Sequence, residues 1–341
     1  MVDIMVADLL VNIFIIGLSF LGLNWASNLG INNALKVSKV TGLSKTAIGF
    51  SLIAFSTSLP ELTVAVIASL SGGAPLSVGN ILGSNIVNIA LIIGLAALII
   101  HYRRPRQANI NNEHNGNELI PVFAKEELGN LHFGLLVASI IPLVLIYIAQ
   151  ATWALGFALI SIFVVYIYQI SKVRIPQENG TVSPDERKKL KRYLFFTFLG
   201  AMGVIISAKF IVESAVAIAG FVGVPQTVIG STIVAFGTSL PEITMDLKAF
   251  MRGQPSLAFG DIIGSSFINI TLILGITLFL PALVDGSLTM NMSVYENLVI
   301  FSIITNIFFW YFLSQGKIGQ KEGAIFLFLY ILFLITTVGA I

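Results

Sequence analysis

Two segments of the chain each place one glutamate inside a long apolar run, in almost the same polar context: AFSTSLPE at residues 54–61 and AFGTSLPE at residues 235–242. Glu242 follows Glu61 by 242 − 61 = 181 residues, and this offset aligns residues 42–94 with residues 223–275 without a gap. Close to half of the aligned positions are identical. The fold must therefore accommodate two related halves, each with a carboxylate in an apolar segment.

The composition is that of an integral membrane protein. Charged residues make up 11% of the chain and hydrophobic residues 56%, whereas soluble proteins carry about 25% charged residues. The net charge of +2 and the absence of a basic stripe exclude a nucleic-acid partner. The chain has no cysteine, and its three histidines lie in or beside one polar segment, so thiolate and histidine metal sites are not expected.

Apolar runs long enough to span a bilayer, about 17–25 residues, fall into two groups of five. They lie at about 6–27, 46–70, 77–100, 133–150 and 152–170, and at about 194–219, 225–250, 256–282, 297–314 and 323–340. We predict an all-α membrane protein of ten transmembrane helices. Residues 1–172 form the first five-helix repeat, with a polar loop at 101–131; residues 173–193 form a linker and residues 194–341 the second repeat. Because five is odd, the two copies cross the membrane in opposite directions, an inverted repeat typical of secondary transporters.

Lysine and arginine are divided unevenly between the two faces of this layout. All of the 19 basic residues except Lys209, inside the sixth helix, fall on one face. The positive-inside rule makes that face cytoplasmic. We therefore predict a multi-pass protein of the cell membrane, with its basic loops and linker in the cytoplasm and both termini outside.

The first polar cluster of each copy surrounds the glutamate. Thr57 and Ser58 stand four and three residues before Glu61, so a helix places all three on one face. Pro60 supplies no amide hydrogen and crowds the carbonyl four residues back, which opens the helix just before the glutamate. The second copy repeats the pattern with Thr238, Ser239, Pro241 and Glu242.

The second polar cluster is GNILGSNIVNI in the first half and GDIIGSSFINI in the second. Ser84 and Asn88 are spaced i, i+4, as are Ser265 and Asn269, so each pair presents neutral oxygens on one helix face. Gly83 and Gly264 are expected to let these helices approach their neighbours closely.

The two glutamates are expected to meet at the membrane midplane when the inverted copies face each other. Two carboxylates supply charge −2 and up to four oxygens, and carbonyls, hydroxyls and waters complete the 6–8 oxygens typical of calcium. One divalent ion neutralises the pair, and so do two monovalent ions or two protons. That equivalence is the physical basis of a cation antiporter, whose site crosses the membrane only when it is loaded.

At these residues the sequence resembles the sodium/calcium exchanger family of calcium/cation antiporters, in the prokaryotic form without a regulatory domain. The resemblance implies a calcium site at Glu61 and Glu242 with the carbonyls of Thr57 and Thr238. It also implies two sodium sites and a middle position lined by Asn88 and Asn269. The implied sodium sites comprise Ala54, Thr57, Ser58, Glu61 and Ser265 in one case and Ala235, Thr238, Ser239, Glu242 and Ser84 in the other. In this family helices two, three, seven and eight form the core, and helices one and six slide past it.

The chain departs from the family pattern at the middle position. Many members carry aspartate at one of the two positions, whereas Asn88 and Asn269 are both asparagine here. The expected core charge is therefore −2, with no third carboxylate.

Three further charged or polar groups fall near the repeats. Asp246 is expected to pair with Lys248 or Arg252 at the cytoplasmic interface, with attraction of ions at the inner mouth as the alternative. Lys209 and Glu213, spaced i, i+4, are expected to pair with each other. The matched residues Asn80 and Asp261 are interpreted first as helix N-caps.

We predict from these features a transporter and not an enzyme. It would be a secondary antiporter that extrudes cytoplasmic calcium in exchange for sodium by alternating access. Calcium and sodium are the transported ions, with no cofactor, and the lipid bilayer is the surrounding, with no obligatory protein partner. A calcium/proton antiporter is the nearest alternative. A cation channel would show ohmic conductance instead of saturable counter-transport, and an intramembrane hydrolase would use the paired acids to activate water.

Overall fold

The computed structural model describes residues 2–70, 74–103, 125–146, 150–151, 153–170, 184–221, 235–285, 288–289 and 295–338, together with Phe123 and Lys172. Its first part contains α1 (Val2–Thr41), α2 (Lys45–Ile48), the π-helical segment η1 (Gly49–Ile53), α3 (Ala54–Thr57), α4 (Leu59–Leu70), α5 (Ala74–Ile86), the π-helical segment η2 (Val87–Leu91) and α6 (Ile92–Arg103). The chain continues with α7 (Lys125–Ile146), β1 (Gln150–Ala151), α8 (Trp153–Ile170), α9 (Pro184–Lys188) and α10 (Leu190–Phe221). The last part contains α12 (Ala235–Thr238), α13 (Leu240–Met251), α14 (Pro255–Ile268), the π-helical segment η4 (Asn269–Ile273), α15 (Leu274–Asp285), β2 (Leu288–Thr289), α16 (Glu296–Gln315) and α17 (Gln320–Val338).

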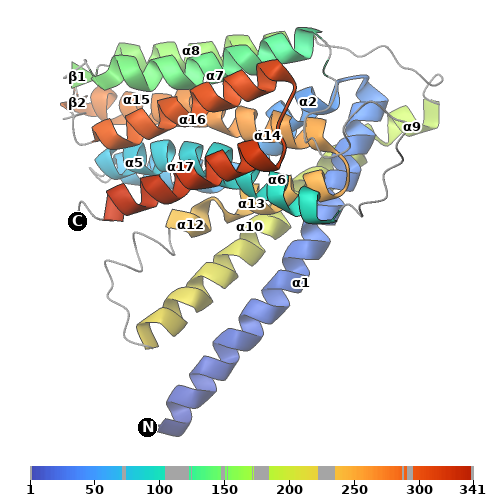
Figure 1. Ribbon diagram of the computed structural model, residues 1–341, viewed down its shortest axis with the longest axis vertical. Coiled ribbons are helices and arrows are strands. Elements are labelled where there is room, and N and C mark those ends of the chain that lie inside the picture. The colour runs from blue at the N-terminus through green and yellow to red at the C-terminus, as the bar shows by residue number, and fades with distance from the viewer. Residues whose placement is uncertain are drawn as a thin grey trace.

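The described chain is helical apart from one short ladder. β1 and β2 pair antiparallel, with Gln150 opposite Thr289 and Ala151 opposite Leu288. The ladder lies at the same end of the helices as the C-terminus, and α9 lies at the opposite end (Figure 1). The two connections between α7 and α8 and between α15 and α16 therefore meet at one end of the molecule.

α14 is the central helix of the bundle. It packs against α2, η1 and α3, and also against α13 and α7. The apolar stretch within Pro255–Leu283 is 83% buried, whereas the stretch within Asp8–Thr41 is only 17% buried. α1 and α10 pack along each other and extend away from the other helices (Figure 1). Most of the α1 surface is therefore apolar and uncovered, as expected of a helix in contact with lipid.

The helices match most of the predicted spans within a few residues. Eight described helices are long and apolar enough to cross a membrane, and the bent pair Lys45–Thr57 and Leu59–Ile67 makes a ninth. The predicted span at 225–250 is described only from Ala235, as α12 and α13, so its first part lies outside the described residues.

Two predicted boundaries are wrong. The first span was expected to end near residue 27, but α1 continues to Thr41 because Ile31, Ala34 and Val37 recur at helical spacing and are buried against the bundle. The linker predicted at 173–193 contains α9 and the start of α10, where Lys189 pairs with Glu186 at 2.8 Å.

Glycines set the closest helix contacts. A Cβ on Gly260 would lie 2.2 Å from the Thr46 carbonyl oxygen, and one on Gly264 would lie 2.6 Å from the Phe50 carbonyl oxygen. Only glycine allows this backbone-to-backbone approach. The expectation for Gly264 is therefore confirmed, whereas a Cβ on Gly83 would meet no atom of the described chain within 4 Å.

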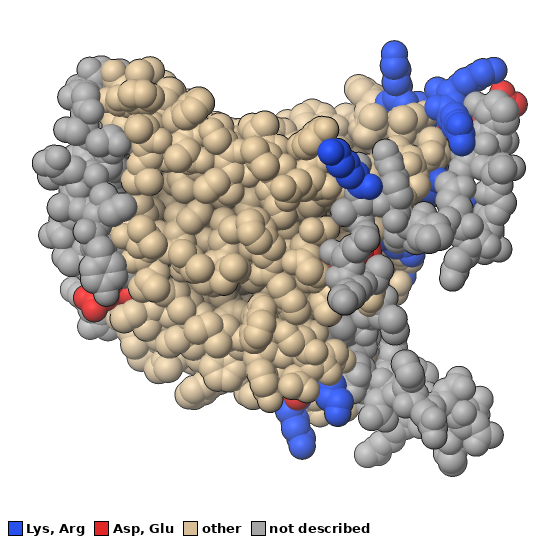
Figure 2. Space-filling model, turned by 90° about the horizontal axis from the view of Figure 1, so that it is seen from above, with Lys and Arg blue, Asp and Glu red and all other residues tan. Residues whose placement is uncertain are grey.

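Charged side chains are gathered at the ends of the helices. Figure 2 shows lysine and arginine concentrated towards one end and a wide surface without charges between the two ends. Such a belt fits the hydrocarbon region of a bilayer.

Candidate functional site

Both copies of the glutamate motif lie at a break in a helix. α3 ends at Thr57, Ser58 leaves the helix with φ −81° and ψ 8°, and α4 begins at Leu59, with a bend of 45° across the break. The second copy breaks in the same way at Ser239, which has φ −88° and ψ 2°. The proline two residues after each break supplies no amide hydrogen, which explains why the helix opens there. The predicted opening before the glutamate is therefore confirmed.

The glutamates themselves are buried. Glu61 and Glu242 are each 1% exposed, and each has an Oε2 atom that is buried without a hydrogen-bond partner. The two side chains lie near enough for their charges to interact. Among the described residues no lysine or arginine is buried, so these carboxylates have no basic side chain beside them.

Hydroxyl groups from both halves surround the glutamates. Ser84 lies beside the Glu61 carboxylate and Ser58 beside the Glu242 carboxylate. Ser239 Oγ donates to Ser84 Oγ at 3.3 Å, which joins α5 to the break before α13. Residues from four different segments therefore converge on the glutamate pair, as the repeat predicts.

The other predicted site residues lie on the same elements. Ala54, Thr57 and Ser265 are fully buried, and Thr238 is half-buried. Thr57 Oγ1 donates to the carbonyls of Ile53 and Ala54 at 3.2 and 3.3 Å. Ala235 is the first residue of α12.

The two middle asparagines lie at matching positions in π-helical segments, Asn88 in η2 and Asn269 in η4. Both are 1% exposed, and the Oδ1 atom of each is buried without a partner. π-Helical turns are rare and occur often at functional sites. The structure adds Asn85, which accepts a hydrogen bond from Asn269 Nδ2 at 3.0 Å. Asn85 was missed because its counterpart 181 residues later is serine, so the repeat does not point to it.

Two further carboxylates lie in the core, which corrects the expected core charge. Asp246 on α13 and Asp261 on α14 are each 1% exposed, and their carboxylates lie within hydrogen-bonding reach of each other. Asp261 Oδ1 accepts from Thr57 Oγ1 at 3.4 Å and from Ser265 Oγ at 3.3 Å. The core therefore holds four carboxylates, formally −4, and not two.

The expectations for these aspartates are wrong. Asp246 does not pair with Lys248 or Arg252, because Lys248 donates to Asn24 Oδ1 and Arg252 donates to Asn32 Oδ1, both on α1. Asp261 is not an N-cap, because α14 begins six residues earlier at Pro255. Asn80 is likewise inside α5, which begins at Ala74. The pair Lys209–Glu213 is confirmed at 3.6 Å, with both side chains more than half exposed.

The four carboxylates do not converge on one point. Within the part of the chain that the structure describes, no group of three or more His, Cys, Asp or Glu side chains is placed to hold a metal ion. Carboxylate, hydroxyl, amide and carbonyl oxygens are the hard ligands that calcium and sodium prefer over softer metals. The arrangement fits a cation that is bound reversibly and not a resident metal.

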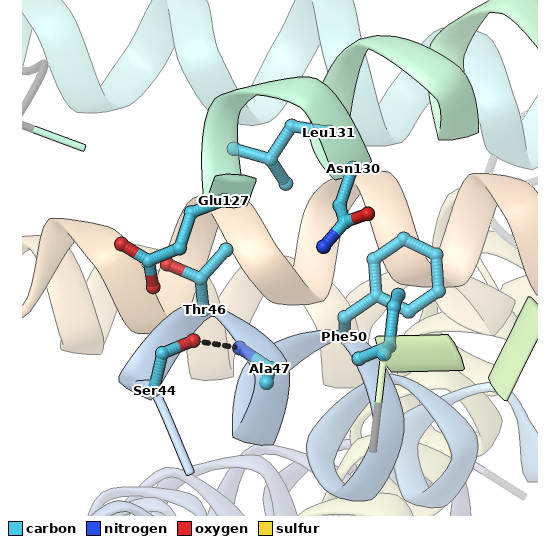
Figure 3. A pocket seen from close by; sticks show the side chains of 8 residues that line it. Ser44, Thr46, Ala47, Phe50, Glu127, Asn130 and Leu131 are labelled. Carbon is cyan, nitrogen blue, oxygen red and sulfur yellow. Dashed lines mark hydrogen bonds between the residues drawn. The ribbon is translucent and has the colours of Figure 1, made fainter. Parts of the chain in front are cut away.

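A separate small pocket lies at the ends of α2 and α7 (Figure 3). Ser44 caps α2 there, with its Oγ accepting from the Ala47 amide at 2.9 Å, and Glu127 of α7 faces Thr46. Its lining residues do not include any of the glutamate or asparagine positions described above. We assign it no role in the candidate site.

A bundle of apolar helices, broken twice at matching polar motifs and holding buried oxygen ligands without basic partners, defines a membrane cation transporter. The comparisons with known proteins identify its family. A family model described as sodium/calcium exchanger protein matches residues 11–172 and 192–339. The chain belongs to the sodium/calcium exchanger family.

Individual relatives cover almost the whole chain. The sodium/calcium exchanger MaX1 of Methanosarcina acetivorans is 30% identical over 95% of this chain and 98% of its own length. A membrane protein of Methanocaldococcus jannaschii, MJ0091, is 30% identical over 94% of this chain and 96% of its own length. A structure of the sodium-calcium exchanger NCX_Mj, soaked with 10 mM Na+ and no Ca2+, is 26% identical with a TM-score of 0.76, over 96% of this chain and 98% of that chain.

Proposed function

We propose that the protein is a sodium/calcium antiporter that extrudes calcium in exchange for sodium by alternating access. The observation that carries the proposal is the burial of Glu61 and Glu242 beside each other, at broken helices, with no buried lysine or arginine among the described residues. Membership of the exchanger family and the names of the relatives support the choice of ions.

The charge balance of the glutamate pair explains why exchange is coupled. An unpaired buried carboxylate costs several kcal/mol, so a site that holds two of them is unfavourable when it is empty. One calcium ion or two sodium ions neutralise the pair. Each loaded form crosses between the two access states, whereas the empty form is held back, so a calcium ion leaves only in exchange for sodium.

We further propose the arrangement of the ligands. Calcium binds between Glu61 and Glu242 with the carbonyls of Thr57 and Thr238. One sodium ion binds near Ala54, Thr57, Ser58 and Ser265, and the other near Ala235, Thr238, Ser239 and Ser84. The contacts of Ser84 with Ser239 and Glu61 support a site built from both halves.

We propose ten transmembrane helices in two inverted repeats, with the basic loops in the cytoplasm. The matched breaks at Ser58 and Ser239 and the matched π-helical turns at Asn88 and Asn269 support a duplicated core. The concentration of basic residues at the end that carries α9 supports the orientation.

The test uses purified protein in sealed liposomes loaded with sodium and diluted into sodium-free buffer that contains radioactive calcium. Calcium uptake that requires internal sodium, and that stops when the sodium gradient is collapsed, is the expected result. Uptake driven by a pH gradient alone would replace sodium by protons as the coupling ion. Calcium flux that follows only the membrane potential, without counter-transport, would indicate a channel and contradict the proposal.

A further inference from the structure

The acidic pair formed by Asp246 and Asp261 is not used by the exchange site proposed above. The two aspartates line one small closed space between α1, η1, α13 and α14, together with Ile31, Ile53 and Leu257. Each side chain is 99% removed from solvent, and each has an Oδ2 atom that is buried without a hydrogen-bond partner. Two carboxylates thus aim into the same space with unused oxygens.

No described basic side chain compensates this pair. The other residues that line the space are aliphatic or sulfur-containing, including Met245 and Ala249. The nearest cations along α13, Lys248 and Arg252, are turned to asparagines of α1. Two adjacent buried carboxylates repel each other strongly in a medium of low dielectric. Charge balance therefore requires a positive partner that is not a side chain of the described chain.

We propose that Asp246 and Asp261 form a second calcium-binding site, one helical turn from the exchange site on its cytoplasmic side. The pair carries formal charge −2, which one divalent cation neutralises. Its flanking groups, the hydroxyls of Thr57 and Ser265 on Asp261 Oδ1, are hard oxygen ligands. This inference rests on the proposed function for the identity of the ion and for the orientation of the chain.

The position of the pair makes it a loading site for the exchange site. Asp246 follows Glu242 by four residues on α13, which is about 6 Å along a helix axis. Thr57 contacts Asp261 and is also a proposed ligand of the exchange site, so oxygen atoms connect the two sites. Ile31 of α1 covers the acidic pair. Displacement of α1 would therefore open this second site towards the cytoplasm first.

The other access side lacks the equivalent charges. At the offset of 181 residues, the counterpart of Asp246 is Ala65 and that of Asp261 is Asn80. The surrounding frame is the same, because Thr238 Oγ1 donates to Asn80 Oδ1 at 3.4 Å, the distance that also separates Thr57 from Asp261. The two sides thus differ by two negative charges in a similar setting. Calcium is expected to bind more tightly from the cytoplasm than from outside.

Equilibrium binding of radioactive calcium to the purified full chain, without sodium, tests the proposal. The double variant Asp246→Ala with Asp261→Asn introduces the residues that the first repeat carries at the same positions. We expect two calcium ions per chain in the native protein, one in this variant, and one in the double variant Glu61→Gln with Glu242→Gln. Glu213→Gln, at an exposed ion pair on α10, is the matched control and should keep two.

The outcomes separate this inference from the proposed function. One calcium ion per native chain, lost only with the glutamates, would overturn the second site and leave the exchange site standing. Loss of one ion with the aspartates but none with the glutamates would contradict the exchange site and keep the second site. Size-exclusion profiles identify variants that fail to fold.

The reciprocal variant, Ala65→Asp with Asn80→Asp, keeps the test decisive if the first variant does not fold. It builds the same acidic pair on the opposite side of the exchange site. In liposomes, the KM for calcium on the external face should fall about tenfold, which corresponds to about 1.4 kcal/mol. The KM on the face with the basic loops should stay the same. An unchanged KM on both faces would overturn the proposal.

Discussion

The hydroxyl of Thr57 lies 3.4 Å from Oδ1 of Asp261, and this contact joins the broken helix of the first half to the central helix of the second. The corresponding contact, from Thr238 to Asn80, has the same length but no charge. The duplicated frame therefore holds the oxygen atoms in similar places on both sides, while the side-chain charge differs. An alternating-access protein built this way presents the same ligands to both compartments with different affinities.

Removing either buried glutamate charge should abolish calcium transport. With Glu61→Gln or Glu242→Gln, the site keeps its shape but loses half of the charge that balances calcium. Breaking a buried charge pair costs about 3–5 kcal/mol, which is more than about a hundredfold in affinity. Sodium-driven calcium uptake in liposomes measures the loss. Robust uptake by either variant would contradict the assigned site.

The same variants should fold and be more stable without ions. Glutamine removes one member of a repelling pair, so the melting temperature in buffer free of sodium and calcium should rise relative to the native protein. Added calcium should raise the melting temperature of the native protein but not of the variants. Glu213→Gln, far from the pair on an exposed helix face, should behave like the native protein in both assays.

Gly264→Ala should destabilise the core next to the exchange site. The new Cβ would lie 2.6 Å from the Phe50 carbonyl oxygen and 2.9 Å from the Ala54 Cβ, so α14 would have to move away from η1 and α3. Overpacking of this kind costs about 1–3 kcal/mol. Gly17→Ala on α1, where a Cβ would meet nothing within 4 Å, is the control. Thermal unfolding in detergent should show a lower melting temperature for the first variant only.

The proposed orientation can be tested with single cysteines, because the native chain has none. Glu296→Cys and Lys317→Cys place thiols at the two ends of the region around α16, where both native side chains are exposed. A membrane-impermeant maleimide added to intact cells should label the thiol at position 296. The thiol at position 317 should react only after the membrane is permeabilised. The opposite pattern would reverse the proposed topology.

Hydrophobic runs predicted most of the helices because a bilayer sets both their length and their composition. The predicted spans 152–170 and 297–314 correspond to α8 (Trp153–Ile170) and α16 (Glu296–Gln315). The repeat located the two glutamates and the two middle asparagines, because each appears twice in the same context. Both kinds of signal are visible along one dimension of the sequence.

The residues that the sequence did not reveal depend on packing between helices. Asp246 stands beside lysine and arginine in the sequence, which made it look like an interfacial charge. Its true neighbour, Asp261, is on the next helix, and the contact exists because α13 and α14 pack side by side. Neither aspartate has an acidic counterpart in the first half, so the repeat gave no signal for them. Asn85 escaped notice for the same reason.

Asn269→Asp should change ion coupling more than calcium binding. Asn269 donates its amide to Asn85 at 3.0 Å, and a carboxylate at position 269 has no hydrogen to donate there. The Asn85 amide nitrogen, which now has no partner, would have to turn towards the new carboxylate. The extra buried charge then requires one more sodium ion or proton per cycle, because the glutamate pair still needs its own neutralising ions.

The coupling ratio measures this effect. Calcium uptake is recorded at a series of membrane potentials and sodium gradients, and the potential at which net flux stops gives the number of sodium ions exchanged per calcium. Uptake at a series of pH values shows whether protons take part. We expect the ratio or the pH dependence to shift in Asn269→Asp while the affinity for calcium stays within about tenfold of the native value. If neither coupling changes, the middle position serves only to hold η4 against α5.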